Sequence, residues 1–337
     1  MNSEIIFLPT PNWFISQPAD LNEQDSMLAT CALNSIILTD TRFECHIGTI
    51  KDAHSKRLHA VSFYKIPTFD YLASCSEDLE IKIWNFKSRC LSTHHKFHQN
   101  PPTCLDWIRV QSLDPTLLSC DIKGNIFKWN LNTNHHVRYF PENRPITQIK
   151  ILENSFKTAI GYKHGSIVLL DSKSDQMSIL AKLKNHEDSI NCLLWCPKSQ
   201  LDSSKVSEEI KCDNLEHVLA SSSEDKTIRI WDTLKEIQLK NFKIPSSGSK
   251  TAQSKANQIH YVPLCWPKIN LILTGSFKGD LFFIDLENLK GISANESMVK
   301  WNHFSALPGP QCHKKIIFDI IHSKDKIITL SLDRLLF

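Results

Sequence analysis

Two sets of side chains in this sequence combine the residue types of general acid–base chemistry. Each set holds a His, a Ser, an Asp and a Trp in the same order: His54, Ser74, Asp78 and Trp84, and then His186, Ser221, Asp225 and Trp231. A His beside a hydroxyl and a carboxylate can activate a nucleophile, or it can belong to a buried polar network that stabilises a fold. Because each set lies in a segment that the chain repeats, we expect all eight residues to be structural.

Other candidates for chemistry are weaker. His94, His95 and His98 suggest a metal, but no Cys or carboxylate lies at ligand spacing from them. The eleven cysteines are scattered, and the pair Cys192 and Cys196 has no second pair, so we expect buried free thiols. The sequence has no phosphate-binding glycine loop, no Gly-x-Ser-x-Gly and no His-Glu-x-x-His. We therefore expect no enzyme, no metal, no cofactor and no small-molecule substrate.

The overall charge excludes one class of function. Thirty-nine basic and 36 acidic residues give a net charge of +3, which is too low for nucleic-acid binding driven by charge alone, although a local site stays open. No apolar run approaches the roughly 20 residues that a membrane span needs. The start at Met1 lacks a basic segment followed by an apolar core, so we expect neither a membrane segment nor a secretory signal.

The chain repeats itself. The segment 219–232, LASSSEDKTIRIWD, recurs at 72–85 as LASCSEDLEIKIWN. Weaker copies occupy 117–130, 158–171 and 272–285, and a partial copy occupies 328–337. The Trp or its replacement stands at positions 84, 129, 170, 231 and 284, near the period of about 40–45 residues that defines one class of repeat protein. Polar stretches at 198–215 and 246–257 lengthen the two wider intervals.

Each repeat predicts a small antiparallel sheet. Within a copy, two runs that alternate apolar and polar residues flank a turn, and a further apolar run such as 190–195 precedes them. A sheet of this size cannot bury both of its faces by itself. Radial stacking of the sheets buries both faces and yields a β-propeller.

These repeats resemble the WD-repeat propeller family over about residues 25–337. The resemblance implies an all-β, seven-bladed WD-repeat β-propeller in which the His, Ser, Asp and Trp of each set form a buried polar chain. Lys123, His164 and Lys278 replace the Asp elsewhere, and a Gly follows each of them and keeps the turn. About six repeat units and the N-terminal strands at 28–38 can be recognised.

The expected domain limits follow from these repeats. We expect an N-terminal extension at 1–27 and the propeller at 28–337. The last repeat stops at Phe337, inside its expected length, so a C-terminally truncated ring without its closure is expected unless another segment closes it.

Several motifs resemble a narrower family, the small-nuclear-RNA-binding gemin subunit of the SMN complex. They are PTPNWF at 9–14, AIGYKHGSIVLLD at 159–171, NHEDSI at 185–190, WCP at 195–197 and SEDKTIRIW at 223–231. The resemblance implies binding of the Sm site of pre-snRNA, delivery to the other SMN-complex subunits for snRNP assembly, and a location in the cytoplasm and in nuclear gems. It leaves recognition of the 7-methylguanosine cap open.

The same resemblance implies an RNA site made of Trp13, Phe14, Tyr261, Lys315 and Arg334. Aromatic rings can stack on unpaired bases, and cations can contact phosphate. The alternative for Trp13 is an N-terminal plug, for Tyr261 a contact between blades, and for Lys315 and Arg334 a solvated charge. The sequence departs from the family at Phe14, where a Tyr is usual, and at Tyr261, where a Trp is usual. A third departure is Ser189, where a Glu is usual; Glu187 and Asp188 could replace that carboxylate.

The sequence is compatible with two functions. The first is an RNA-binding recognition module without catalysis. The second is a generic WD-repeat protein-interaction scaffold or ubiquitin-ligase adaptor. Retention of a uridine-rich Sm-site RNA, weakened by Trp13→Ala and by Tyr261→Ala, would separate the first from the second.

Overall fold

The computed structural model describes residues 6–7, 12, 15–110, 113–198, 206, 209–212, 214–244, 261–275, 279, 281–286, 302–303, 313, 315–323, 326–333 and 335–336. Strands and turns dominate these ranges, and η1, at Leu215–His217, is a short 3-10 helix. No helix in this part of the chain is both long and apolar enough to cross a membrane. Two of the expected RNA-site regions, at Trp13–Phe14 and at Arg334, lie outside the described residues.

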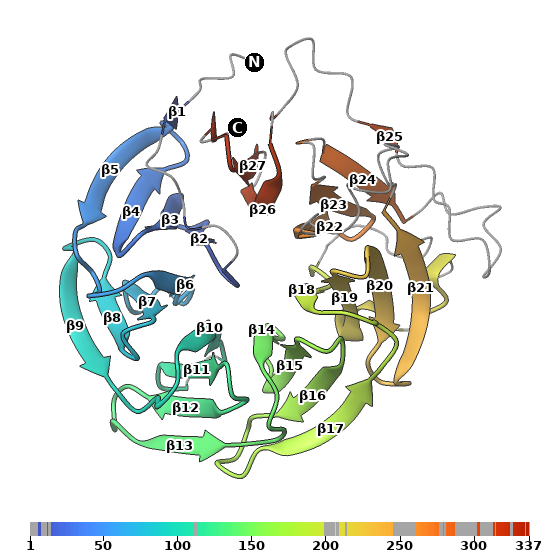
Figure 1. The fold of residues 1–337 in the computed structure, drawn as a ribbon, viewed down its shortest axis with the longest axis horizontal. Helices are drawn as coiled ribbons and strands as arrows, with labels where there is room; N and C mark the ends of the chain where they lie inside the picture. The colour runs from blue at the N-terminus through green and yellow to red at the C-terminus, as the bar shows by residue number, and fades with distance from the viewer. Residues whose placement is uncertain are drawn as a thin grey trace, which may run out of the picture.

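The described strands form seven four-stranded antiparallel sheets around a common axis (Figure 1). Six sheets are blades of four consecutive strands, numbered here along the chain. Blade 1 comprises β2 (Ala19–Asn22), β3 (Met27–Ala32), β4 (Ser35–Asp40) and β5 (Cys45–Ile50). Blade 2 comprises β6 (Leu58–Phe63), β7 (Tyr71–Ser76), β8 (Ile81–Asn85) and β9 (Cys90–His95). Blade 3 comprises β10 (Pro102–Ile108), β11 (Thr116–Asp121), β12 (Ile126–Asn130) and β13 (His136–Tyr139).

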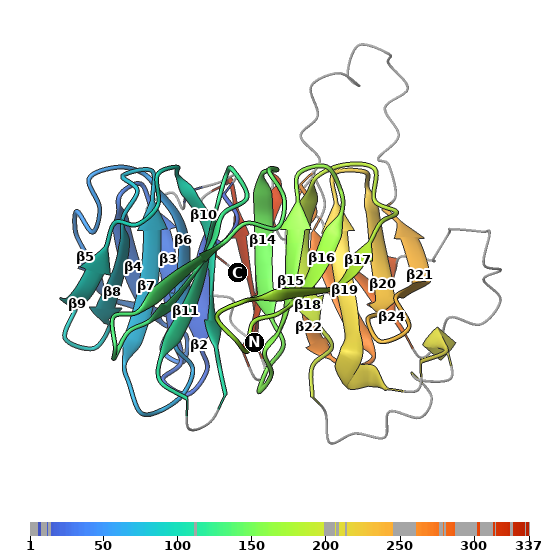
Figure 2. The same cartoon turned by 90° about the horizontal axis from the view of Figure 1, so that it is seen from below.

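The next three blades repeat this order. Blade 4 comprises β14 (Ile146–Ile151), β15 (Lys157–Tyr162), β16 (Ile167–Asp171) and β17 (Ser178–Leu183). Blade 5 comprises β18 (Ile190–Trp195), β19 (Val218–Ser223), β20 (Thr227–Asp232) and β21 (Ile237–Lys243). Blade 6 comprises β22 (Leu264–Lys268), β23 (Leu271–Gly275), β24 (Leu281–Asp285) and β25 (Asn302–His303). In each blade the first strand lies nearest the axis, and the strands run through the thickness of a flat disc (Figure 2).

A composite sheet, blade 7, holds the remaining position in the ring. It joins β26 (Ile317–Ser323), β27 (Lys326–Ser331) and β28 (Leu335–Leu336) to β1 (Ile6–Phe7) from the other end of the chain. Ile6 pairs with Leu336 and Phe7 pairs with Leu335. The all-β propeller is therefore confirmed, but the details of the expected ring are corrected: six blades are contiguous, and β1 completes the last repeat, which the sequence left open. The first blade also takes in residues 19–22, which the sequence assigned to the N-terminal extension.

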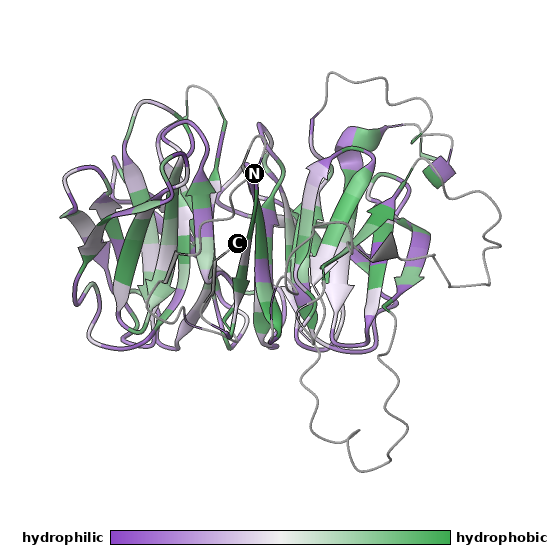
Figure 3. Ribbon diagram, turned by 90° about the horizontal axis from the view of Figure 1, so that it is seen from above, coloured by the Kyte–Doolittle hydropathy of each residue, from purple (hydrophilic) through white to green (hydrophobic). Residues whose placement is uncertain are grey.

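Apolar side chains fill the seams between neighbouring blades. Buried clusters span every neighbouring pair of sheets, including the seam between blade 7 and blade 1, where Leu21 and Leu28 pack with Ile328. Between blades 2 and 3, Trp107 is fully buried, and its indole Nε1 donates to the Ser62 carbonyl oxygen of the preceding blade at 2.9 Å. Removing such a side chain typically costs about 3–5 kcal/mol. Figure 3 shows the result, with apolar strands inside and polar turns at the two faces of the disc.

The turns between second and third strands need one residue of positive φ. Gly124 supplies it at φ +93°, and a Cβ there would overlap the backbone of residues 142–144. In the blades that keep the turn Asp, the equivalent strain falls on Leu79 at φ 72° and on Lys226 at φ 66°. Gly in the weaker repeats therefore keeps the turn without an Asp, as the sequence predicted.

Candidate functional site

The predicted site residues that the structure describes lie on one face of the ring. Leu58 at the start of β6 pairs with Ser76 at the end of β7, and Ile190 pairs in the same way with Ser223. The starts of the inner strands and the turns between second and third strands therefore share a face, called here the upper face. The turns between third and fourth strands lie on the opposite, lower face. Tyr261 stands three residues before β22, and Lys315 two residues before β26, so both belong to the upper face.

The blades of a propeller surround a central channel, and the upper end of that channel is called here the channel mouth. Tyr261 precedes the inner strand of blade 6 and so lies at this end. It is partly exposed, and burial raises the pKa of its hydroxyl well above the usual range, as do the neighbouring Asp319 and Cys192 to a smaller extent. Asp319 and Cys192 lie on the inner strands of blades 7 and 5, and Tyr261 precedes the inner strand of blade 6. The phenol therefore stays neutral, and its side chain is partly exposed. Lys315 is exposed, and its carbonyl oxygen accepts from Ser331 Oγ at 3.2 Å.

Asp319 is the channel residue that the sequence did not reveal. Burial raises the pKa of its carboxyl to about 7, and the charge of Asp20 adds to this effect. A hydrogen bond from the Ile320 backbone N–H at 2.9 Å and the charge of Lys150 act in the opposite direction. Asp319 on β26 and Lys150 on β14 belong to blades 7 and 4, on opposite sides of the ring, so their interaction places both side chains toward the axis. Near neutral pH the carboxyl can both donate and accept.

The channel wall carries further paired charges. Lys65 Nζ donates to Asp20 Oδ1 at 2.8 Å, and the charge of Lys65 holds the pKa of Asp20 below its usual value although burial would raise it. Arg109 contacts Asp106 at 2.8 Å, and the other oxygen of Asp106 accepts from the Ile151 backbone N–H at 2.8 Å. Each of these carboxylates is therefore neutralised by its own cation.

The N-terminal segment lies against the inner strands. Gln17 pairs in parallel with Ala60 on β6, and its Oε1 accepts from the Leu105 backbone N–H on β10 at 2.9 Å. Gln148 Nε2 on β14 donates to the Ser16 carbonyl oxygen at 2.8 Å. Further upstream, the buried Asn12 donates to the carbonyl oxygens of Leu33 and Leu58 at 2.8 and 3.0 Å, at the upper ends of blades 1 and 2. The described residues on both sides of Trp13 and Phe14 are thus attached to the ring.

The two predicted His–Ser–Asp–Trp sets form hydrogen-bonded chains. In blade 2, Trp84 Nε1 donates to Ser74 Oγ at 2.9 Å, and Ser74 Oγ lies 2.8 Å from His54 Nε2. His54 Nδ1 lies 3.0 Å from Asp78 Oδ2. Blade 5 repeats the chain, with all three contacts at 2.8 Å, through residues Trp231, Ser221, His186 and Asp225.

Two further hydrogen-bonded sets, each built on a His, a hydroxyl residue and an Asp, were not predicted from the sequence. In blade 3, His98 Nε2 lies 2.8 Å from Ser119 Oγ, and Nδ1 lies 3.5 Å from Asp121. In blade 7, His313 lies 2.8 Å from Thr329 Oγ1 and 2.9 Å from Asp333. Asp121 stands two positions before the turn position that holds Asp in the sharper repeats, and Thr329 replaces Ser. A search for any His about 20 residues before a hydroxyl residue and an Asp would have found both.

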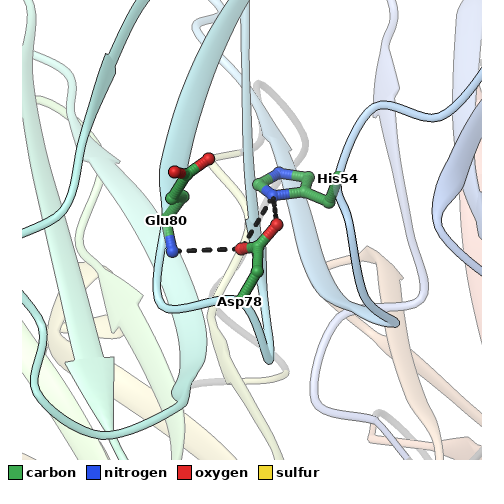
Figure 4. A group of neighbouring side chains, drawn as sticks. All are labelled: His54, Asp78 and Glu80. Carbon is green, nitrogen blue, oxygen red and sulfur yellow. Dashed lines mark hydrogen bonds and ion pairs between the residues drawn. The ribbon is translucent and has the colours of Figure 1, made fainter.

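One acidic cluster has the composition of a metal site. Ligand atoms of His54, Asp78 and Glu80 lie within 4.8 Å of one another (Figure 4). Both His54 nitrogens already face hydrogen-bond partners, and Asp78 accepts from the backbone N–H groups of Ser55 and Glu80. The Glu80 carboxylate pairs with Lys82 at 3.4 Å. The donors are therefore used within the fold, and the cluster is structural.

Comparison with known proteins finds WD repeats in this chain and similar proteins that span most of it. The pattern of the WD domain, G-beta repeat, matches residues 45–85 and 177–232. Gem-associated protein 5 of Mus musculus is 25% identical, and that of Homo sapiens 26% identical, over 97% of this chain. The chain folds as a β-propeller, and the two matched segments are WD repeats.

This WD-repeat propeller spans about a quarter of the length of those relatives, since it covers 23% of each. A chain in the crystal structure of the mitotic checkpoint complex has a TM-score of 0.74 and 14% identity, covering 99% of this chain and 90% of that one. At this identity the likeness shows the fold alone.

Carboxylates lie next to Ser189, which is one of the positions where the sequence departs from the gemin family. Ser189 is buried, its backbone N–H donates to Asp188 Oδ1 at 2.8 Å, and its carbonyl oxygen accepts from the Glu224 N–H at 2.9 Å. Burial raises the pKa of Glu224, the charge of Asp188 adds to this, and Lys163 opposes it. Glu224, which was not predicted as a site residue, directly precedes the turn Asp225 of the sharpest repeat. It provides a half-buried carboxylate next to the position where the family has Glu.

Proposed function

We propose that this WD-repeat propeller is a recognition module for single-stranded RNA that binds the Sm site of pre-snRNA at its upper face. The observation that carries the proposal is the similarity to Gem-associated protein 5, which extends over 97% of the chain. The proposal includes delivery of the RNA to SMN-complex subunits for snRNP assembly, in the cytoplasm and in nuclear gems. It gives the propeller no catalytic role.

The geometry of the channel mouth supports this proposal. Unpaired bases are bound by stacking on aromatic rings and by hydrogen bonds to their edges. The neutral Tyr261 supplies a ring at the mouth. The Asp319 carboxyl, with a pKa of about 7, accepts from a base N–H when it is ionised and donates to a base carbonyl when it is protonated.

Phosphate contacts complete the proposed site. Exposed Lys315 lies at the same face, one blade away from Tyr261. In this proposal Lys315 and Arg334 contact the RNA backbone, while Trp13 and Phe14 add stacking surfaces. Phosphate contacts position the strand, and contacts to base edges provide sequence preference. Asp188 and Glu224 lie beside Ser189, the position where the family has Glu, so their carboxylates offer acceptors for a guanine-like edge.

The test is the affinity for a capped, uridine-rich Sm-site oligonucleotide at fixed salt, measured by fluorescence anisotropy. Tyr261→Ala is expected to weaken binding about tenfold, since a stacked base contributes roughly 1–3 kcal/mol. Tyr261→Phe keeps the ring and is expected to stay within about threefold of the parent, because only the hydroxyl contact is lost. Tyr71→Ala is the matched control, because Tyr71 begins a second strand and lies at the lower face.

The outcomes separate the rival functions. Equal affinity of Tyr261→Ala and Trp13→Ala with the parent shows that the site is misassigned. A folded parent protein that retains no RNA at physiological salt favours the interaction scaffold or ubiquitin-ligase adaptor. A melting curve for each variant establishes that the protein tested is folded.

A further inference from the structure

A concave site, called here the rim pocket, lies away from the channel, at the rim of the upper face between blades 2 and 3. Its volume is about 290 Å³, and it is lined by Phe97, Gln99, Asn125, Phe127, His136 and Arg138. The first two come from the connection between β9 and β10, and the others come from β12, β13 and the turn before β12. No residue proposed for the channel-mouth site lines this pocket.

Flat rings form one wall of the rim pocket. Phe97 stacks on Phe127 with ring centroids 4.9 Å apart and an interplanar angle of 28°. Phe97 also stacks on His136 at 5.1 Å and 19°. Phe127 is buried, Phe97 is partly exposed and His136 is exposed, so the stack reaches from the core to the solvent. Such a stack offers a planar ligand a preformed surface.

Polar groups converge on the same pocket. Arg138 Nε donates to Asn125 Oδ1 at 2.8 Å, and Asn125 Nδ2 donates to Asp121 Oδ2 at 2.7 Å. Asn125 is buried and is therefore held in one orientation, which in turn orients the guanidinium. Within the described part of the chain, no carboxylate forms an ion pair with Arg138. Its terminal amino groups can therefore bind an external anion in bidentate fashion.

The surroundings of the pocket are basic. Lys123 belongs to the turn before Asn125, and the backbone of Arg144 lies against Gly124 of that turn. Among the residues described, neither cation pairs with a carboxylate, whereas the nearby Glu142 is paired with Lys182. A chain of net charge +3 thus gathers three cations at one corner of its upper face.

We propose that the rim pocket holds one nucleotide of single-stranded RNA, with the base against the ring stack and the phosphate at Arg138. The inference deepens the proposed function, since it rests on RNA being the ligand. The volume suits a planar ring better than a folded peptide segment. The repeated charge of a phosphate backbone also matches the group of cations formed by Lys123, Arg138 and Arg144. The upper face would then guide a strand from the channel mouth outward across blade 3.

Arg138→Gln tests the pocket, because glutamine removes the charge and keeps a donor for Asn125. With uridine-rich oligonucleotides long enough to cross from the channel to the rim, affinity is expected to fall about fivefold. The slope of log K against log salt is expected to become shallower by about 0.7, the value for one phosphate contact on a single strand. Lys173→Gln, with the same charge change in a lower-face turn, is the matched control and should change neither quantity.

A direct readout complements affinity. Oligonucleotides carrying 4-thiouridine are expected to crosslink on irradiation to the peptide that contains Phe97 or to the one that contains His136. His136→Ala, an exposed substitution, should reduce the second adduct.

Each outcome decides a separate point. If Tyr261→Ala weakens binding but Arg138→Gln alters neither affinity nor salt slope, the rim pocket is refuted and the channel site stands. If the folded parent binds no RNA, both proposals fail. If an acidic, aromatic peptide binds in an Arg138-dependent manner and RNA does not compete with it, the pocket is a peptide site and the inference is wrong.

Discussion

The His–Asp pairs show how one constellation of residues can serve structure and not catalysis. In blade 2 the His54 side chain is fully shielded from solvent, and burial lowers the pKa of its imidazole. Neutral His54 donates from Nδ1 to Asp78, which leaves Nε2 to accept the Ser74 hydroxyl proton. Because Ser74 Oγ also accepts from the Trp84 indole, the side-chain polar atoms of these four residues all have partners. No group remains to act on a substrate.

Removal of one side chain from the hydrogen-bonded set of His54, Ser74, Asp78 and Trp84 is expected to destabilise the protein. Asp78→Ala leaves His54 and two backbone N–H groups without their acceptor, so the free energy of unfolding should fall by about 2–4 kcal/mol. Glu80→Gln alters only a partly exposed ion pair and should change it by less than about 0.5 kcal/mol. Urea unfolding followed by tryptophan fluorescence measures both. If His54, Asp78 and Glu80 held a metal, a chelator would lower the midpoint of the parent and Glu80→Gln would match Asp78→Ala.

Residue types predicted these hydrogen-bonded chains only where the repeats keep strict register. The sequence predicted the hydrogen-bonded sets of His54 and His186 because both repeats keep Ser, Asp and Trp at fixed spacing. It did not reveal the pairing of His98 with Asp121, because that Asp lies two positions earlier, at the end of a strand. It did not reveal Asp319 because the raised pKa of that carboxyl comes first from burial and then from the charge of Asp20, and both depend on how the blades assemble around the axis.

At the level of elements, the closure of the ring depends on very little chain. β1 and β28 are two residues each, too short to show any alternation of apolar and polar residues. The paired residues Ile6 and Leu336, one from each strand, are also separated by nearly the whole sequence. The repeats therefore predicted blades 2 to 6 and the start of the last sheet, and the N-terminal strands at 28–38 belong to blade 1. The strand that completes the last sheet could not be predicted from local pattern.

Deletion of residues 1–7 should open this seam. Without β1, the edge of β28 loses its partner, and exposed edges recruit other chains. We expect the free energy of unfolding to fall by about 1–3 kcal/mol, the scale of a few lost backbone hydrogen bonds, together with concentration-dependent association. Differential scanning calorimetry and light scattering measure these effects. Deletion of residues 1–4 keeps β1 and is the control; equal behaviour of the two deletions would show that β1 does not close the ring in solution.

On the scale of the whole molecule, the buried charges set the response to pH. Burial lowers the pKa of the four network histidines, His54, His98, His186 and His313. Below about pH 6.5 the unfolded chain therefore binds more protons at these groups than the folded chain does, and stability falls. Asp319 acts in the opposite sense. Its pKa of about 7 lies above the unfolded value of 3.8, so the folded state takes up its proton first as the pH falls.

The four histidines outnumber the single carboxyl, so the melting temperature is expected to decrease as the pH falls from about 7.5 to about 5.5. Asp319→Asn separates the two contributions, because it removes the desolvated charge and keeps the shape. The variant should be more stable than the parent by about 1–2 kcal/mol above pH 7, as one pKa unit corresponds to about 1.36 kcal/mol and the partial exposure of Asp319 allows solvent to screen part of the shift. Its advantage should shrink steadily as the pH falls toward 3.8, below which both states of the parent bind the Asp319 proton. Calorimetry across this range provides the measurement. A constant difference between variant and parent at every pH would mean that Asp319 does not titrate with a raised pKa, and the channel would then hold an ordinary ionised carboxylate.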